Sequence, residues 1–156
     1  MWYIVSVVNS SNAALGNAVD SREFVTARKR LKKTQKEMAE LLGVSIKAVH
    51  SYEQGWRSIP AHVERQVFFL LARRRDARLQ QKACWVVKKC PPKRRKQCPA
   101  WEFQAGKLCW FINGTICECQ VKKNWQEKMK VCRQCEVLAS LLEDADPDAP
   151  QTTPSK

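Results

Sequence analysis

Apolar residues between positions 21 and 75 recur at intervals of three and four, which is the spacing of helices with one buried face. Four such segments follow one another, separated by short polar stretches. The apolar positions expected to face their core are Phe24, Ala27, Leu31, Met38, Leu41, Leu42, Ala48, Val49, Tyr52, Val63, Val67, Leu70 and Leu71. The pattern predicts a compact bundle of four or five helices over residues 22–75.

Signals for helix ends fall between these segments. Thr34 and Glu37 have the T-x-x-E spacing of a capping box, so a helix is predicted to begin there. Gly43 is expected to end that helix, because a left-handed backbone conformation costs glycine little. Ser45 can cap the next helix, and Pro60 suits the first turn of a fourth.

The second and third segments meet at Gly43 with the composition of a helix-turn-helix. Ala39 is small where the two helices must approach, and Val49 is apolar where the second helix needs a wedge beneath it. The stretch "TQKEMAELLGVSIKAVHSYEQG" resembles the Cro and phage-repressor type of helix-turn-helix, over about residues 22–75. The resemblance implies an all-α fold whose second helix braces the third against double-stranded DNA.

The same resemblance implies a set of DNA-contacting residues. Lys47 could donate to guanine and Ile46 could contact a thymine methyl group. Gln35 is expected near phosphate, and the residues after the third helix near the DNA backbone. The expected DNA-binding residues are Gln35, Ser45, Ile46, Lys47, His50, Ser51, Trp56 and Arg57. In related folds the position of Glu53 pairs with an arginine of the first helix, so a partly buried Arg28–Glu53 ion pair is also expected.

The net charge of +13 is consistent with a polyanionic partner, nucleic acid first and an acidic membrane surface second. No apolar run approaches the roughly 18–20 residues of a membrane span. Residues 1–21 lack the positive start of a secretion signal, so we expect a cytoplasmic protein with a poorly ordered N-terminal extension and no membrane partner.

All eight cysteines lie between residues 84 and 142. In a reducing compartment, clustered cysteines more often bind metal than form disulfides. Four thiolates could hold zinc or an iron–sulfur cluster, while disulfides and unliganded core thiols remain alternatives. The candidate ligands are Cys84, Cys90, Cys98, Cys109, Cys117, Cys132 and Cys135. The last two are expected on one face of a single helix that Asn124 caps.

Two Cys-Trp pairs, a Cys-Pro-Ala step, a Gly-Thr-x-Cys step and a final C-x-x-C make residues 83–138 resemble the bacterial two-CW module. Cys119 lies outside that pattern, and "PPKRRKQ" replaces the usual glycine-rich insertion. Its tryptophans, Trp85, Trp101 and Trp110, are expected to be core residues.

The expected fold is mainly α: a helix-turn-helix bundle at 22–75, a basic linker at 76–83, a loop-rich cysteine module at 84–142 ending in a helix, and a disordered tail at 143–156. We expect a sequence-specific transcriptional regulator and no enzyme, with a homodimer expected only by analogy. The alternatives are an antitoxin-like interaction partner and a C-x-x-C thiol oxidoreductase.

Overall fold

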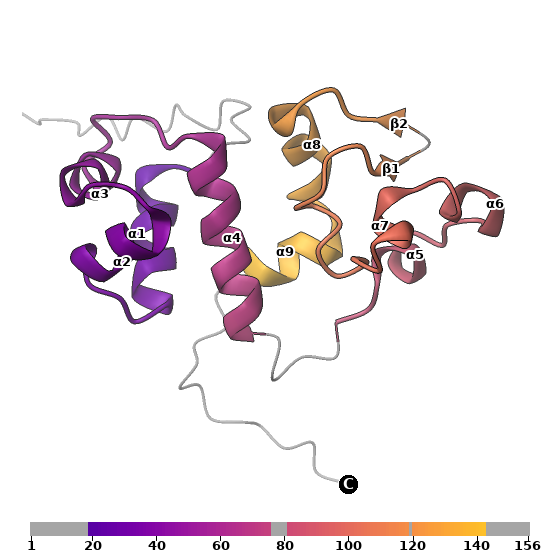
Figure 1. Cartoon of the computed structure of the whole chain (residues 1–156), viewed down its shortest axis with the longest axis horizontal. Coiled ribbons are helices and arrows are strands. Elements are labelled where there is room, and N and C mark those ends of the chain that lie inside the picture. Colours follow the sequence, from indigo (N-terminus) through magenta and orange to yellow (C-terminus); the bar gives the residue numbers. More distant parts are fainter. Residues whose placement is uncertain (1–18, 76–80, 119, 143–156) are drawn as a thin grey trace, which may run out of the picture.

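The computed structural model describes residues 19–75, 81–118 and 120–142. The expectations for the N-terminal extension, most of the linker, Cys119 and the acidic tail lie outside the described residues. The described chain forms two mainly helical halves side by side, with the last helix crossing back to the first half (Figure 1). Across the described ranges, no helix is both long and apolar enough to cross a membrane.

Four helices build the first half: α1 (Ser21–Arg30), α2 (Gln35–Leu42), α3 (Ile46–Glu53) and α4 (Ala61–Arg75). Helix α3 packs against α1 and α2, and α4 packs against the same two helices. The four helices surround a shared core. Its most completely buried side chains are Phe24, Met38, Val49, Val63 and Val67.

Three of the predicted helix ends in this half form as expected, while Pro60 lies just before α4 rather than in its first turn. The Thr34 hydroxyl accepts the Glu37 N–H, and the Glu37 carboxylate accepts the Thr34 N–H, which completes the capping box. Gly43 adopts φ +63° at the end of α2. The Ser45 side chain accepts the Ala48 N–H and caps α3.

One predicted core position of this half is wrong. Leu41 is 45% exposed, whereas Ala39 on the same helix is buried. The i, i+3, i+4 pattern allowed either assignment for two adjacent leucines. Helix α2 turns Leu42 inward, and at about 100° per residue this rotates Leu41 towards solvent.

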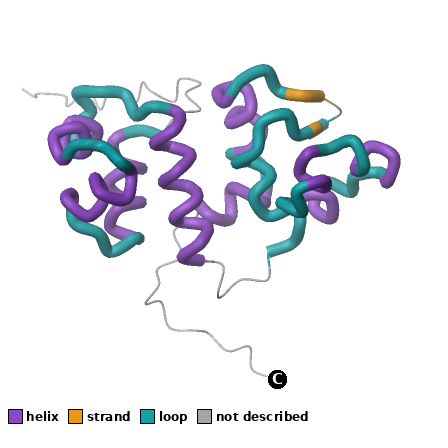
Figure 2. Tube along the Cα trace, viewed as in Figure 1, coloured by secondary structure: helices purple, strands orange, loops and turns teal. Residues whose placement is uncertain are grey.

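The second half contains short helices joined by loops (Figure 2). Its elements are α5 (Cys84–Val87), α6 (Pro92–Arg95), α7 (Pro99–Glu102), β1 (Ile116–Cys117), β2 (Gln120–Val121), α8 (Trp125–Cys132) and α9 (Glu136–Leu142). The two strands pair antiparallel, with Ile116 opposite Val121. Trp110 is a core residue as expected, while Trp85 and Trp101 are half-buried with their rings edge to face at 4.9 Å.

The predicted single C-terminal helix is wrong, because the chain bends between α8 and α9. Asn124 does cap α8, accepting the Glu127 N–H. Cys132, however, is the last residue of α8, and Cys135 lies in the turn before α9, so they do not share a helix face. In one continuous helix, the buried residues of α8 and those of α9 would point about 175° apart, on nearly opposite sides. The bend allows both sets to be buried.

The two halves pack directly against each other, and α9 lies on α4. The Arg30 guanidinium of α1 donates to the carbonyl oxygens of Leu141, at 2.9 Å, and Leu142, at 3.4 Å. These bonds satisfy backbone acceptors at the end of α9 that have no partner within the helix. Phe68 of α4 meets Trp110 edge to face, at 6.0 Å between ring centroids.

Candidate DNA-binding surface and cysteine cluster

Helix α3 has one buried and one exposed side. Val49 and Tyr52 are buried against the first half, while Ile46 is 49% exposed and Lys47 and His50 are exposed. Ser45, which caps α3, is also exposed. Four of the predicted DNA-contacting residues therefore lie together at the start of α3 and along its exposed side. The exposed side of α3 combines an apolar group, an ammonium group and an imidazole, which is the chemistry that reads base edges.

The remaining predicted DNA-contacting residues differ in whether their polar groups already have a partner within the protein. The Ser51 hydroxyl donates to the Lys47 carbonyl at 2.9 Å, so its proton is already used within α3. Trp56 follows α3 and is 73% exposed, with its ring edge to face with His50 at 5.3 Å. Arg57 beside it is also exposed.

The bend between α2 and α3 is held by backbone bonds. The Val44 N–H donates to the Ala39 carbonyl at 3.0 Å, and the Gly43 N–H donates to Glu40 at 3.3 Å. The Val44 bond requires the left-handed conformation at Gly43, which residues other than glycine rarely adopt. The turn therefore fixes the angle at which α3 leaves α2.

The Arg28–Glu53 ion pair expected from the sequence is present, and it includes a third residue. Arg28 Nε donates to Glu53 Oε1, and Gln35 Nε2 donates to Glu53 Oε2 at 2.7 Å. The Glu53 side chain is 7% exposed. Burial alone would raise the pKa of Glu53, but the bonds from Arg28 and Gln35 outweigh it and hold that pKa below 4.5. This network ties the end of α3 to α1 and α2.

Gln35 therefore has a structural bond that sequence reasoning did not anticipate. Its side-chain amide donates to Glu53, while its expected position near a phosphate stays a prediction. The signal available in the sequence was Glu53 itself, a carboxylate that needs buried donors.

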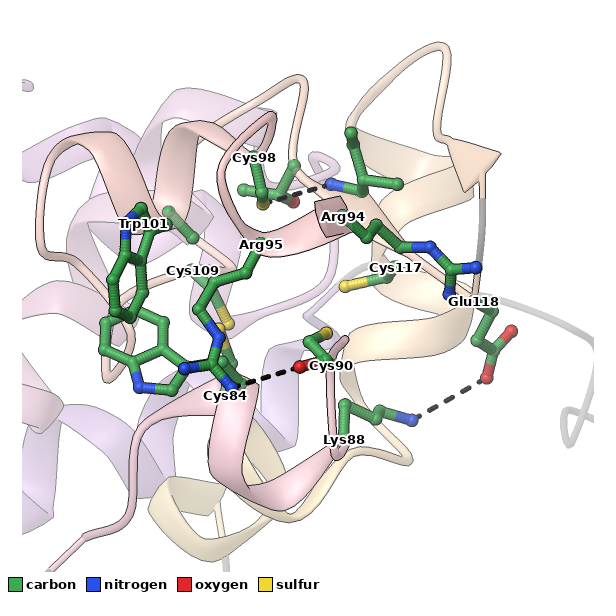
Figure 3. A pocket seen from close by; sticks show the side chains of 14 residues that line it. Cys84, Lys88, Cys90, Arg94, Arg95, Cys98, Trp101, Cys109, Cys117 and Glu118 are labelled. Atoms are coloured by element: carbon green, nitrogen blue, oxygen red, sulfur yellow. Dashed lines mark hydrogen bonds and ion pairs between the residues drawn. The ribbon is translucent and has the colours of Figure 1, made fainter. Parts of the chain in front are cut away.

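The seven described cysteines line two adjoining cavities in the second half. The larger, here called the outer cavity, has a volume of about 110 Å³, and Figure 3 shows its lining. Its cysteines are Cys84, Cys90, Cys98, Cys109 and Cys117. The smaller, here called the inner cavity, has a volume of about 10 Å³. Its cysteines are Cys84, Cys109, Cys117, Cys132 and Cys135.

The structure brings the predicted ligands together without focusing them on one point. Within the described ranges, no three Cys, His, Asp or Glu side chains are close enough to share a single metal ion. The neighbouring Cys109 thiol lowers the pKa of Cys84 to about 7, and Cys84 in turn raises the pKa of Cys109.

Three of the other thiols, those of Cys90, Cys117 and Cys132, favour the protonated form. Burial raises the pKa of Cys90 and Cys117, and it raises the pKa of Cys132 to about 11. A thiol is a weak nucleophile when its pKa is raised in this way. Cys132 is therefore a poor candidate for thiol–disulfide exchange.

A buried lysine beside the thiols was missed by sequence reasoning. Lys128 of α8 is 4% exposed, and its ammonium donates to the Thr115 hydroxyl. It forms no ion pair with a carboxylate of the described chain, and its charge acts on Cys84, Cys117 and Cys132. The available signal was its place three residues after Trp125, on the apolar side of α8.

The fold of the first half is a helix-turn-helix, with α2 and α3 joined at Gly43. A helix-turn-helix family model matches residues 26–61, which include that turn and all of α2 and α3. The match indicates a DNA-binding protein with a role in transcription regulation. Neither the curated proteins nor the solved structures give a significant match to the chain.

Proposed function

We propose that this chain is a sequence-specific transcriptional regulator that places α3 in the major groove of DNA. The observation that carries the proposal is the orientation of α3 after the glycine turn, with Val49 buried and Ile46, Lys47 and His50 turned outward. A rod of helix diameter fits the major groove, where each base pair presents a distinct pattern of groups.

The roles follow from the chemistry of the exposed groups. Lys47 donates to a guanine, Ile46 contacts a thymine methyl group, and His50 contacts a base or a phosphate. Trp56 and Arg57 lie after α3 and contact the DNA backbone. Gln35 acts mainly through Glu53, since its amide is already bonded there.

Most of the affinity then comes from phosphate contacts, in keeping with the net charge of +13. A single helix of eight residues reads only a short site. By analogy with other helix-turn-helix proteins, two copies bind half-sites about 34 Å apart.

The test compares Lys47→Ala with Lys130→Ala on a preferred duplex and on random duplexes. Both variants lose one exposed lysine, but Lys130 lies on α8 in the other half. Losing a base contact lowers discrimination by about 1–3 kcal/mol, or roughly 5- to 150-fold. We expect Lys47→Ala to lose affinity for the preferred duplex in this range and Lys130→Ala to keep its preference. Equal losses on both kinds of duplex would contradict the role of Lys47.

We also infer that the cysteine-rich half binds a thiophilic metal centre, with zinc and iron as the candidate metals. Seven thiols gathered at two adjoining cavities support this, because soft thiolate ligands select such metals. The buried ammonium of Lys128 adds support, since bound thiolates supply the negative charge that it lacks. Metal analysis of the full chain purified without oxygen tests the inference, and a metal-free protein would contradict it.

A further inference from the structure

We propose that the outer cavity holds an iron–sulfur cluster rather than a single metal ion. This deepens the metal-binding inference above and rests on it. The ligands assigned here are Cys84, Cys90, Cys98 and Cys117.

The spread of the thiols favours a cluster. One zinc ion draws four sulfur atoms to about 2.3 Å from a common centre. In the described chain no three donors approach one point, although five thiols surround one cavity. The ligands of an iron–sulfur cluster bind different iron atoms, so their sulfur atoms stand around a volume instead of a point.

The volume of the outer cavity agrees with this arrangement. At about 110 Å³ it is several times larger than the roughly 10–15 Å³ that a cavity needs to hold one water molecule. The inner cavity, of about 10 Å³, is barely large enough for a single water. A centre of several atoms is therefore compatible with the volume of the outer cavity and not with that of the inner one.

The two cavities also separate the ligands from the remaining cysteines. Cys132 and Cys135 line only the inner cavity, so they are not ligands. Cys109 lines both cavities and, at 5% exposed, is the most deeply buried of the five thiols around the outer one, so it is left out of the ligand set. Figure 3 shows Cys84, Cys90, Cys98 and Cys117 arriving from different segments of the chain around the cavity.

The polar surroundings suit an anionic cluster. Lys88, Arg94 and Arg95 line the outer cavity, and they oppose a single carboxylate there, that of Glu118. The Ile116 N–H donates to Cys98 Sγ at 3.4 Å. Hydrogen bonds to ligand sulfur and nearby positive charge stabilise the negative charge that four thiolates bring.

The experiment uses the full chain purified without oxygen and, in parallel, loaded with ferric iron and sulfide. Iron, zinc and acid-labile sulfide are measured, together with visible absorption before and after reduction by dithionite. We expect iron and sulfide in similar amounts, several atoms of each per chain, and absorption that bleaches on reduction. Zinc alone would overturn the cluster and leave metal binding intact, whereas the absence of both metals would overturn both inferences.

The ligand assignment is tested by Cys98→Ser with Cys135→Ser as the matched control. Both cysteines are half-buried, but only Cys98 lines the outer cavity. Cys98→Ser is expected to lose most of its iron and sulfide, and Cys135→Ser to keep them. Equal loss in both variants would overturn the assignment.

A measurement on the wild-type chain tests the same ligand assignment without depending on a variant that folds. Iodoacetamide modification is mapped by mass spectrometry in the loaded protein and after removal of metal with a chelator. Loading is expected to protect Cys90 and Cys98 and to leave the modification of Cys135 unchanged. If Cys135 were protected while Cys98 was still modified, the centre would lie in the inner cavity and the proposal would be overturned.

Discussion

Replacing Arg133 with methionine tests how the two halves are held together. Arg133 follows α8, and its Nη1 donates to Glu23 of α1 at 2.8 Å, while its Nη2 lies 3.4 Å from Glu64 of α4. Trp125 Nε1 donates to the other Glu64 oxygen at 3.0 Å. Glu64 is 1% exposed, so Arg133 is the cation that balances a carboxylate buried between the halves.

The expected cost follows from this geometry. Removing one partner of a buried ion pair costs about 3–5 kcal/mol. The Arg133–Glu64 contact is long and Trp125 remains as a donor, so we expect Arg133→Met to lose about 2–3 kcal/mol. Methionine keeps most of the apolar stem. The control is Lys130→Met, which removes an exposed pair with Glu127 and is expected to cost at most about 0.5 kcal/mol.

Urea unfolding of the full chain at two pH values supplies the assay. Burial raises the pKa of Glu64 above 4.5, against the opposing effect of Trp125 and Arg133. A raised folded-state pKa means that stability is fully present below 4.5 and is lost as pH rises through the folded-state pKa. Without Arg133 the pKa of Glu64 rises further, so the loss in Arg133→Met is larger at pH 7 than near pH 4.5.

Two outcomes would refute this reasoning. One is a loss in Arg133→Met no greater than that in Lys130→Met. The other is a loss that stays the same at both pH values, since that would show that the unbalanced Glu64 carboxylate is not its cause. Adding Glu64→Gln to Arg133→Met is expected to remove the pH dependence.

Two further substitutions test the geometry of the helix-turn-helix. Glu53→Ala is expected to cost about 2–3 kcal/mol in urea unfolding, because it leaves the half-buried Arg28 without its carboxylate. The pKa of Glu53 is lowered on folding, so its contribution is present above pH 4.5 and is lost as pH falls through the folded-state pKa; the difference between wild type and variant shrinks there. Gly43→Ala is expected to lower stability by about 1–2 kcal/mol, measured in the same way, because φ is +63°. An unchanged midpoint for Gly43→Ala would show that the turn relaxes.

Local signals in the sequence were sufficient to predict most of the helix ends in the first half. A capping box, a glycine that ends a helix and a serine cap each act within a few residues, and all three form as predicted. The Arg28–Glu53 pair was expected from a family resemblance. Gln35 also donates to Glu53, because a buried carboxylate can accept more than one hydrogen bond.

Long-range packing explains what sequence reasoning missed. The helix predicted over 124–142 has continuous periodicity, and the bend becomes favourable because α9 then packs on α4 and α5, which are distant in sequence. Arg133 is typical of a surface charge on such a helix, whereas Lys128 lies on its apolar side, which indicates burial but not a partner. Their partners, Glu64 and Thr115, are distant in sequence, so no local pattern could reveal these contacts.

The most direct test of the central claim is selection of bound duplexes from a random DNA library, followed by sequencing. The account predicts that the full chain enriches one short motif, that Lys47→Ala weakens the preference at one position of it, and that Lys130→Ala selects the same motif as the wild type. Binding without enrichment, or an unchanged motif in Lys47→Ala, would contradict the claim that α3 reads the sequence through this side chain.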